Sequence, residues 1–493
     1  MAEPRDDLRA RVASERQGLA LPLRTLVKRA PVTCEEQSSV AQAAQIMRAQ
    51  DVGSVVIVDA RHQPCGILTT RDLVGVVAEG GLERPVAELM SRELVTLPQH
   101  AFAYEAALEM IERHIRHILV TDDGRLIGVV SERDLFALQR LGLGELTMEI
   151  RLANDLDTLA GLAAQVRSLA ALLVEQGTAP EPLTLFISVL NDRLTRRVIE
   201  VVRRRHELER MRWAWIAFGS EGRFEQTFST DQDNGLVFAT HEGLSAEQAR
   251  AKLVPFAREV NEALDACGFP LCEGNIMASN PALCLTIEEW RAKMGGWLDA
   301  SVPQALLDAS ICFDLRPVYG DEALAAALRD WIVEHVRGHA AFLRLLARVA
   351  TQARPPLGHF GAFTPMDAPG APHTLNLKAN GARIFVDAAR VLGLAHGLRE
   401  TNTADRLRAF RDARGLPPAE TDALIGAFYF IQDLRLRGQS LAPEARAGGR
   451  SAAEDLANRI DPDQLNAFEQ SVLKEAFRLA RQLQSRIELD FQV

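Results

Sequence analysis

Residues 217–238 read AFGSEGRFEQTFSTDQDNGLVF, which places a Gly-Ser pair shortly before an Asp-x-Asp pair. The apolar and aromatic run of residues 213–218 ahead of this pair predicts a buried strand that ends at Gly219 and Ser220. Small residues at such a turn let backbone N–H groups and a hydroxyl approach phosphate oxygens closely, which a larger side chain would prevent.

The two aspartates follow ten residues later. We expect Asp231 and Asp233 within a second strand, where a spacing of two residues points both carboxylates to the same face. Two hard oxygen ligands on one face suit Mg²⁺ that is bound together with a triphosphate. A Gly-Ser pair alone is usually a turn and an Asp-x-Asp pair alone is usually a solvated loop. In this order and between two apolar strands, they favour an enzyme that transfers a nucleotide on magnesium.

At this point the segment resembles the nucleotidyltransferase superfamily. Gln232 and Asn234 depart from the apolar residues of the generic pattern and are similar to the amino-terminal part of the protein-PII uridylyltransferases, in which a Gly-Arg-x-Glu sequence also precedes the aspartates, here within residues 221–225 (EGRFE). The resemblance implies that Asp231 and Asp233 bind the metal. It also implies contacts to the nucleotide from Gly219, Ser220 and Arg223.

Composition limits the remaining possibilities. A chain of 493 residues suggests about three domains. A formal net charge of −10 without a long Lys/Arg block gives no support to nucleic-acid binding. No apolar run approaches the roughly 20 residues of a membrane span and the start lacks an apolar signal region, so we expect no membrane segment. The six cysteines lack Cys-x-x-Cys spacing, which favours reduced thiols and a cytoplasmic protein.

An internal repeat lies between residues 24 and 140, after an amino-terminal extension (residues 1–23). Gly66, Thr69 and Asp72 recur as Gly128, Ser131 and Asp134, each at an offset of 62 residues. Each copy, residues 24–82 and 83–140, predicts an extended piece, an amphipathic helix, two strands and a second helix. A repeat this short cannot cover both faces of its small sheet, so the two copies should pack together.

The repeat resembles a pair of cystathionine-β-synthase (CBS) domains, a Bateman module. This resemblance implies an adenine nucleotide held through the Ser/Thr-x-x-Asp elements, with Arg71 and Arg133 as candidates to neutralise its phosphates. The elements are Thr69 with Asp72 and Ser131 with Asp134. A hydroxyl followed three residues later by an acid at a helix start is also a capping arrangement, which alone would explain both copies.

Residues 141–210 predict a helical linker that is interrupted near residues 177–182. This linker is either a signal path, a passive spacer or a dimer contact.

Residues 211–338 predict an α/β catalytic domain. In it, Asp314 is expected in the middle of an apolar strand, where a charge costs several kcal/mol unless it is paired or binds a cation. Asp314 is therefore a candidate third metal ligand. The alternative is a buried ion pair with Arg316 or another arginine.

Residues 339–493 predict a helical domain. Lys378 and Arg383 gather where a helix begins, which favours a phosphate contact; an ordinary surface position is the alternative for Lys378. The run of residues 399–407 resembles the carboxyl-terminal substrate-binding domain of the same family.

From about residue 24 the chain is similar to bacterial signal-transduction nucleotidyltransferases with CBS domains. The expected fold class is α/β plus all-α: a tandem CBS module, a mixed sheet with helices, and a carboxyl-terminal helical bundle. The resemblance implies Mg²⁺-dependent transfer of a nucleoside monophosphate to a hydroxyl, catalysed with Asp231, Asp233 and Asp314. It also implies regulation by adenine nucleotide, a PII-like protein as one acceptor, and a homodimer. No His-Asp phosphohydrolase signature is present, so removal of the nucleotide by the same chain is not expected.

Two alternatives remain open at the level of sequence. One is a nucleotide sensor without catalysis that keeps the transferase fold as a binding scaffold. The other is an energy-sensing protein that acts through its CBS pair alone.

Overall fold

A computed structural model describes most of the chain and divides it into two compact units, Met1–Met148 and Glu149–Val493. Predictions for residues 1–21 and for Arg71 lie outside the described residues. The described residues are 22–27, 29–59, 63–70, 72–73, 81–113, 115–135, 143–209, 211–240, 243–299, 310–358, 361–441 and 455–493.

The first unit contains two small sheets of the same construction, which confirms the internal repeat. In each sheet the first strand is parallel to the second and the second is antiparallel to the third. The strands are β1 (Thr33–Glu35), β2 (Ser54–Val58) and β3 (Pro64–Thr69) in one sheet, and β4 (Thr96–Pro98), β5 (His117–Asp122) and β6 (Arg125–Ser131) in the other.

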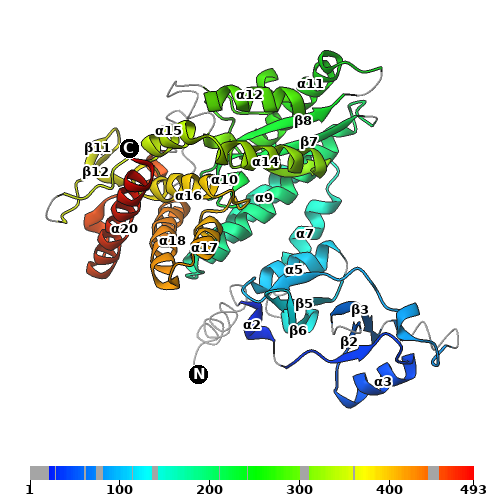
Figure 1. Ribbon diagram of the computed structural model, residues 1–493. Helices are drawn as coiled ribbons and strands as arrows, with labels where there is room; N and C mark the ends of the chain where they lie inside the picture. Colours follow the sequence, from blue (N-terminus) through cyan, green and yellow to red (C-terminus); the bar gives the residue numbers. More distant parts are fainter. Residues whose placement is uncertain are drawn as a thin grey trace, which may run out of the picture. The chain divides into compact units, whose positions relative to one another are not determined.

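Amphipathic helices follow the first strand of each copy (Figure 1). In the first copy, Ser39 begins the helix with a capping box to Gln42, and Val40, Ala43 and Met47 bury one face. In the described part of this unit, the helices ahead of residue 140 are α2 (Leu23–Leu26), α3 (Val40–Ala49) and α5 (Ala103–Glu112), with short 3₁₀ turns η1 (Val86–Glu88) and η2 (Glu132–Leu135).

Three helices precede the central sheet of the second unit: α7 (Leu143–Leu152), α8 (Leu156–Glu175) and α9 (Pro180–Arg203). The latter two, expected as a linker, belong to the second compact unit. Among the described helices, α8 is the one that is long and apolar enough to cross a membrane, with a mean hydropathy of 1.3. This differs from the expectation that no segment reaches that length. Leu159, Leu162 and Val166 of α8 are buried and the helix packs against α9, as a core helix of a folded domain does.

The central sheet of the second unit is mixed. Its order is β10-β7-β8-β9, in which β8 and β9 are parallel and the other neighbours are antiparallel. Strand β7 confirms the predicted apolar strand ahead of the Gly-Ser pair. The elements are β7 (Arg212–Ala217), α10 (Gly219–Gly222), β8 (Asn234–Ala239), α11 (Ala246–Ala266), η3 (Pro281–Leu283), β9 (Cys284–Thr286), α12 (Ile287–Asp299) and β10 (Arg316–Gly320).

Two strand predictions need correction. Strand β8 begins at Asn234, so Asp231 and Asp233 lie in the loop before it. The loop is tied to a different segment, because the Gln232 N–H donates to the Pro270 carbonyl and the Gln232 side-chain amide donates to two further carbonyls. Asp314 lies two residues ahead of β10 rather than in the middle of a strand.

The rest of the second unit is mainly helical, with a small sheet β11-β12-β13. Asp321 accepts from the Ala323 N–H and caps the helix that follows β10. The elements are α14 (Glu322–Arg337), α15 (Ala340–Ala350), β11 (Met366–Ala368), β12 (Ala371–Asn376), the π-helical turn η4 (Lys378–Ala382), α16 (Arg383–Ala395), α17 (Thr403–Arg414), α18 (Pro418–Leu441), β13 (Arg459–Ile460), η5 (Pro462–Gln464) and α20 (Ala467–Phe491).

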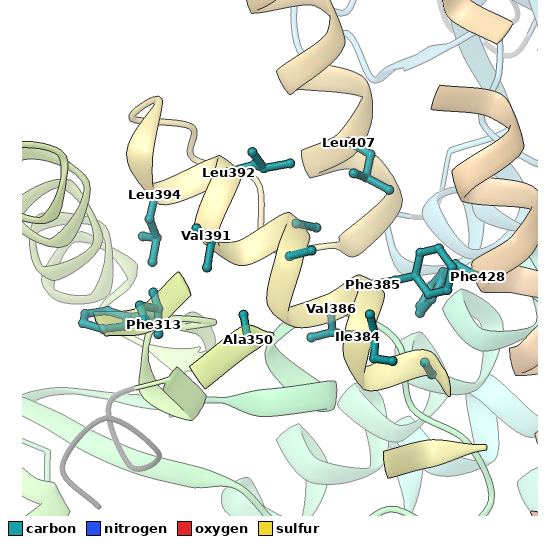
Figure 2. Packing of buried hydrophobic residues seen from close by; sticks show 14 of the residues in the cluster. Phe313, Ala350, Ile384, Phe385, Val386, Val391, Leu392, Leu394, Leu407 and Phe428 are labelled. Atoms are coloured by element: carbon teal, nitrogen blue, oxygen red, sulfur yellow. The ribbon is translucent and has the colours of Figure 1, made fainter. Parts of the chain in front are cut away.

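One apolar core joins the central sheet to these helices. Ile216 and Val237 of the sheet belong to the same buried cluster as Phe385, Phe428 and Phe477 of the helices. Figure 2 shows the middle of this cluster, where apolar side chains of α16 lie among residues from before β10 and from α15, α17 and α18. The predicted fold class, α/β plus all-α, is confirmed, and the shared core fixes the helices against the sheet.

Candidate functional site

The turn after β7 depends on glycine at two positions. Gly219 has a φ of +54°, and a Cβ there would lie 2.5 Å from Asp233 Oδ2. A Cβ at Gly222 would lie 1.7 Å from the backbone oxygen of Asp314. A side chain is therefore excluded at Gly219 by the backbone conformation and at Gly222 by contact with the backbone. Gly219 thus allows the turn to approach Asp233, and Gly222 allows it to approach the backbone of Asp314.

The Asp-x-Asp loop is held against the residue 270–276 loop. The Asn234 N–H donates to the Ile276 carbonyl, and the Asn234 side-chain oxygen accepts from the Ala278 N–H. This pairing brings Cys272 to the aspartates, and the ligand atoms of Asp231, Asp233 and Cys272 all lie within 4.8 Å of one another. The loop is a place where three metal-ligating side chains converge.

The carboxyl of Asp233 is strongly affected by this environment. Burial raises its pKa to about 7, with a further increase from the neighbouring Asp231. A hydrogen bond from the Cys272 thiol and the charges of Lys378 and Arg223 act in the opposite direction. Burial and the charge of Asp233 raise the pKa of the Cys272 thiol to about 12.

A cavity of about 510 Å³ opens beside this loop and gathers most of the predicted site residues. The sequence-predicted residues that line it are Gly219, Ser220, Arg223, Asp231, Asp233, Lys378 and Arg383. They come from the turn after β7, the loop before β8, the η4 turn and the start of α16, and the cavity thus unites residues more than 150 positions apart in the chain.

Asp314 does not join the other two aspartates. It is fully buried and its oxygens accept hydrogen bonds from Arg223, Arg390 and Arg406 at 2.6–2.7 Å. Burial opposes its ionisation, but Arg390, Arg406 and Arg223 together hold its pKa well below the usual range. The expected third metal ligand is thus an ion-pair partner, since arginines already occupy both of its oxygens. Arg316, the other partner considered, pairs with Asp192 of α9.

The predicted cations occupy different positions in the cavity. Lys378 is close enough to Asp233 to lower the pKa of its carboxyl. Arg383 is about half exposed and pairs with Asp387 one turn further along α16, with Nε to Oδ2 at 3.1 Å. Arg223 is largely buried and bridges Glu225 and Asp314.

Sequence reasoning missed several residues of the site. Arg390 of α16, Arg435 of α18 and Cys272 line the cavity. Arg390 stands inside the apolar run IFVDAARVLGLA, where an unexpected charge is a signal of a buried ion pair that could have been followed. For Cys272 no local signal exists, because its partners lie in a different loop.

The carboxyl-terminal helices contact the turn after β7 on one side. The Asn402 side chain donates to the Arg223 carbonyl at 3.0 Å, and the Thr403 N–H donates to Glu225 Oε1 at 2.6 Å. Both contacts come from the amino-terminal end of α17. They fix the residues after Gly222 to the carboxyl-terminal helices.

In the first unit, a smaller cavity of about 120 Å³ lies between the two repeat copies. It is lined by the first copy's residues 29–32 and 52–54 and by His117, Ser131 and Asp134 of the second copy. Thr69 and Asp72 are not among its lining residues. Of the two predicted nucleotide-binding elements, the second thus lines this cavity.

Each Ser/Thr-x-x-Asp element makes local hydrogen bonds. Asp72 Oδ2 accepts from the Thr69 N–H and hydroxyl, both at 2.8 Å. Asp134 Oδ2 accepts from the Ser131 N–H at 2.9 Å and from its hydroxyl at 2.5 Å. This is the capping arrangement considered as an alternative, and it occurs in both copies.

Comparison with known proteins agrees with this organisation. Three family models match in order: "CBS domain" at residues 23–79 and 86–140, "Putative nucleotidyltransferase DUF294" at residues 164–304, and "Putative nucleotidyltransferase substrate binding domain" at residues 340–491. The nucleotidyltransferase model therefore begins within α8.

Individual relatives match a smaller part of the chain. The "Uncharacterized protein MK0525" of Methanopyrus kandleri is 33% identical over 118 residues, which are 23% of this chain and 60% of that protein. A 17.7 kDa protein of Acidianus ambivalens is 30% identical over 98 residues, 20% of this chain and 60% of that protein. The chain thus spans about 60% of the length of these two curated relatives.

Among solved structures, the CBS domain protein PAE2072 from Pyrobaculum aerophilum, complexed with AMP, is 27% identical with a TM-score of 0.24. It covers 25% of this chain and 98% of its own. The three family models, in their order along the chain, show a CBS domain pair followed by a domain of the family described as "Putative nucleotidyltransferase DUF294" and by the substrate binding domain of that family.

Proposed function

We propose that the protein is a Mg²⁺-dependent nucleotidyltransferase that transfers a nucleoside monophosphate from a nucleoside triphosphate to a hydroxyl group and releases pyrophosphate. The observation that carries this proposal is the single cavity that contains a glycine turn, two adjacent carboxylates and several cations. A nucleotide needs these three features for its phosphates and its metal ion.

The residues present fit a magnesium ion. Asp231 and Asp233 offer hard oxygen ligands beside a cavity, and Gly219 leaves free the space next to Asp233 that a side chain would fill. The proposed set of magnesium ligands does not require Asp314. When bound there, Mg²⁺ would orient the triphosphate and stabilise the negative charge that develops on its oxygens.

The chain's own residues have separate roles in this proposal. The Ser220 hydroxyl and the backbone after Gly219 would hold the phosphates, and Lys378 and Arg383 would neutralise the charge of the departing pyrophosphate. The acceptor hydroxyl would attack the α-phosphorus in line, and the bond from that phosphorus to the bridging oxygen would break. Residues of α16 and α18 line the cavity and would limit the access of water to the reaction.

The finer assignments are also proposals. Similarity to the protein-PII uridylyltransferases makes UTP and a PII-like protein one candidate pair of substrates. The small cavity of the CBS pair would bind an adenine nucleotide and shift the enzyme between states, provided that the nucleotide prefers one state. A homodimer in the cytoplasm stays a prediction.

The test is label transfer from each of the four α-labelled nucleoside triphosphates, with and without Mg²⁺, in the full chain and in Asp231→Asn with Asp233→Asn. Transfer that requires Mg²⁺ and is lost in the double variant supports the proposal. Undiminished transfer in the double variant contradicts it. Mg²⁺-dependent triphosphate binding without transfer to any acceptor would favour the non-catalytic sensor, and adenine nucleotide binding to the first unit alone would favour a protein that acts through its CBS pair.

A further inference from the structure

The third member of the metal-ligating group is a sulfur atom. The sequence suggests an aspartate in this role, but Asp314 is held by arginines, whereas Cys272 Sγ lies within 4.8 Å of the ligand oxygens of Asp231 and Asp233. A thiolate is a soft ligand that Mg²⁺ does not use and that Zn²⁺ and Co²⁺ bind well. The same three side chains are thus suited to two classes of cation.

Cys272 is a protonated thiol in the metal-free site, because burial and the charge of Asp233 raise its pKa to about 12. The backbone N–H groups of Gly274 and Ile276 act in the opposite direction and lower the pKa of the thiol. Donors of this kind stabilise negative charge on sulfur and orient a ligating side chain. The loop that supplies them is fixed to the Asp-x-Asp segment by bonds from Gln232 to Pro270 and from Asn234 to Ile276.

The sulfur is also accessible to an ion. Cys272 is partly buried and lines the same cavity as the two carboxylates. Cys267, Cys284 and Cys312 are buried and lie outside the lining of this cavity. Among the cysteines of the second unit, all of which the structure describes, Cys272 is the one that a cation in the cavity can reach.

We propose that Asp231, Asp233 and Cys272 form a binding site for a thiophilic divalent cation of the Zn²⁺ and Co²⁺ class, which competes with Mg²⁺ for the two carboxylates. Binding breaks the S–H bond, the proton leaves to solvent, and the sulfur electron pair forms the metal–sulfur bond. Cys272 thereby sets the metal selectivity of the site and makes it sensitive to zinc. The inference rests on the proposed metal site, but it is tested without measuring transfer.

The first experiment uses Co²⁺ as a spectroscopic probe of the full chain. A cobalt–thiolate bond gives a near-ultraviolet charge-transfer band that oxygen ligands alone do not give. We expect this band in the unsubstituted protein and in Cys65→Ser, a partly exposed thiol of the first unit that serves as the matched control. We expect no band in Cys272→Ser. In the same variant, the affinity for Zn²⁺ should fall at least about tenfold, whereas the affinity for Mg²⁺ should change less than about twofold.

A second measurement needs no variant. Alkylation of Cys272 by iodoacetamide, followed by mass spectrometry of its peptide, should be slowed at least about tenfold by Zn²⁺ and left unchanged by Mg²⁺. A charge-transfer band that persists in Cys272→Ser, or alkylation that Zn²⁺ does not slow, would overturn the inference. The proposed transferase fails separately, because it fails when Mg²⁺ supports no triphosphate binding, whatever the result with Co²⁺.

Discussion

The guanidinium of Arg390 donates to both oxygens of Asp314, with Nη2 2.7 Å from Oδ2 and Nε 3.2 Å from Oδ1. Arg390 belongs to α16 and Asp314 to the segment ahead of β10, so the pair links the carboxyl-terminal helices to the central sheet of the second unit. Both side chains are almost completely buried. Arg390 also lines the cavity, and the link therefore sets one wall of the candidate site.

Removal of the Asp314 charge should destabilise the second unit severely. The Asp314→Asn variant leaves Arg223, Arg390 and Arg406 without their shared counter-charge. An uncompensated buried charge costs about 3–5 kcal/mol of folding free energy. The matched control is Asp330→Asn, which breaks a half-exposed pair with Arg399 and should cost less than about 1 kcal/mol. Urea unfolding of the two variants measures the difference, and similar costs would show that the cluster is not a structural link.

The site divides into parts that sequence could and could not predict. Gly219, Ser220, Asp231 and Asp233 could be found because their spacing is local and their chemistry is distinctive. The partners of Asp314 could not, since Arg390 lies 76 residues and Arg406 lies 92 residues further along the chain. A buried carboxylate requires an opposite charge beside it. Sequence alone left open whether a metal ion or an arginine supplies that charge.

In the CBS pair, too, sequence could predict some features and not others. Two copies with a constant offset predict both sheets, because strands and helices follow from hydrophobic periodicity. The repeat also suggests equal roles for Thr69 and Ser131, yet the cavity of the first unit is lined by Ser131 and not by Thr69. The packing of the two copies determines which residues face this cavity, and the repeat pattern alone does not specify that packing.

Gly222→Ala should be poorly tolerated. The added methyl would meet a backbone oxygen, which cannot turn away as a flexible side chain can, so we expect a loss of about 3 kcal/mol or more in the free energy of unfolding. Gly426→Ala is the matched control. Gly426 is exposed on α18 with open space around its Cβ position, and alanine there should stabilise the helix by about 0.5–1 kcal/mol. Opposite shifts of the unfolding midpoint are expected; shifts of the same sign would contradict the close approach.

Lys378→Ala should weaken binding of Mg²⁺–nucleoside triphosphate. A charge-assisted contact to phosphate contributes about 1.5–3 kcal/mol, which corresponds to a loss of affinity of about 10- to 150-fold. The control is Lys252→Ala on α11, which removes a half-exposed lysine that contacts Glu207 and not the cavity. Calorimetric titration gives both dissociation constants. Equal affinities for the two variants would place Lys378 outside the nucleotide site.

The two CBS elements provide a matched pair of variants. Asp72→Asn and Asp134→Asn each weaken the local bonds to a preceding hydroxyl and N–H, so both should lower the stability of the first unit by about 1 kcal/mol. Only Asp134 lines the cavity, and its variant alone should lose at least about tenfold in affinity for AMP. Titration of the full chain with AMP measures this. Equal losses in both variants would contradict a site in the described cavity.

Glu221 should make stability depend on pH. Burial and the nearby Asp192 raise its pKa from 4.5 to about 8, although Arg316 acts in the opposite direction. Because the folded protein then holds a proton that the unfolded chain releases, the stability from this group is complete below pH 4.5 and falls as pH rises towards 8. The slope is at most about 1.4 kcal/mol per pH unit.

Glu221→Gln, which is neutral at every pH, should remove this decline, so that it matches the unsubstituted protein near pH 5 and exceeds it at pH 8. The control is Glu475→Gln, a half-exposed residue of α20 paired with Arg478, which should keep the original pH dependence. Urea unfolding between pH 5 and pH 8.5 measures the slopes. An unchanged slope in Glu221→Gln would mean that Glu221 is ionised in the folded protein, with Arg316 and not a bound proton compensating its burial.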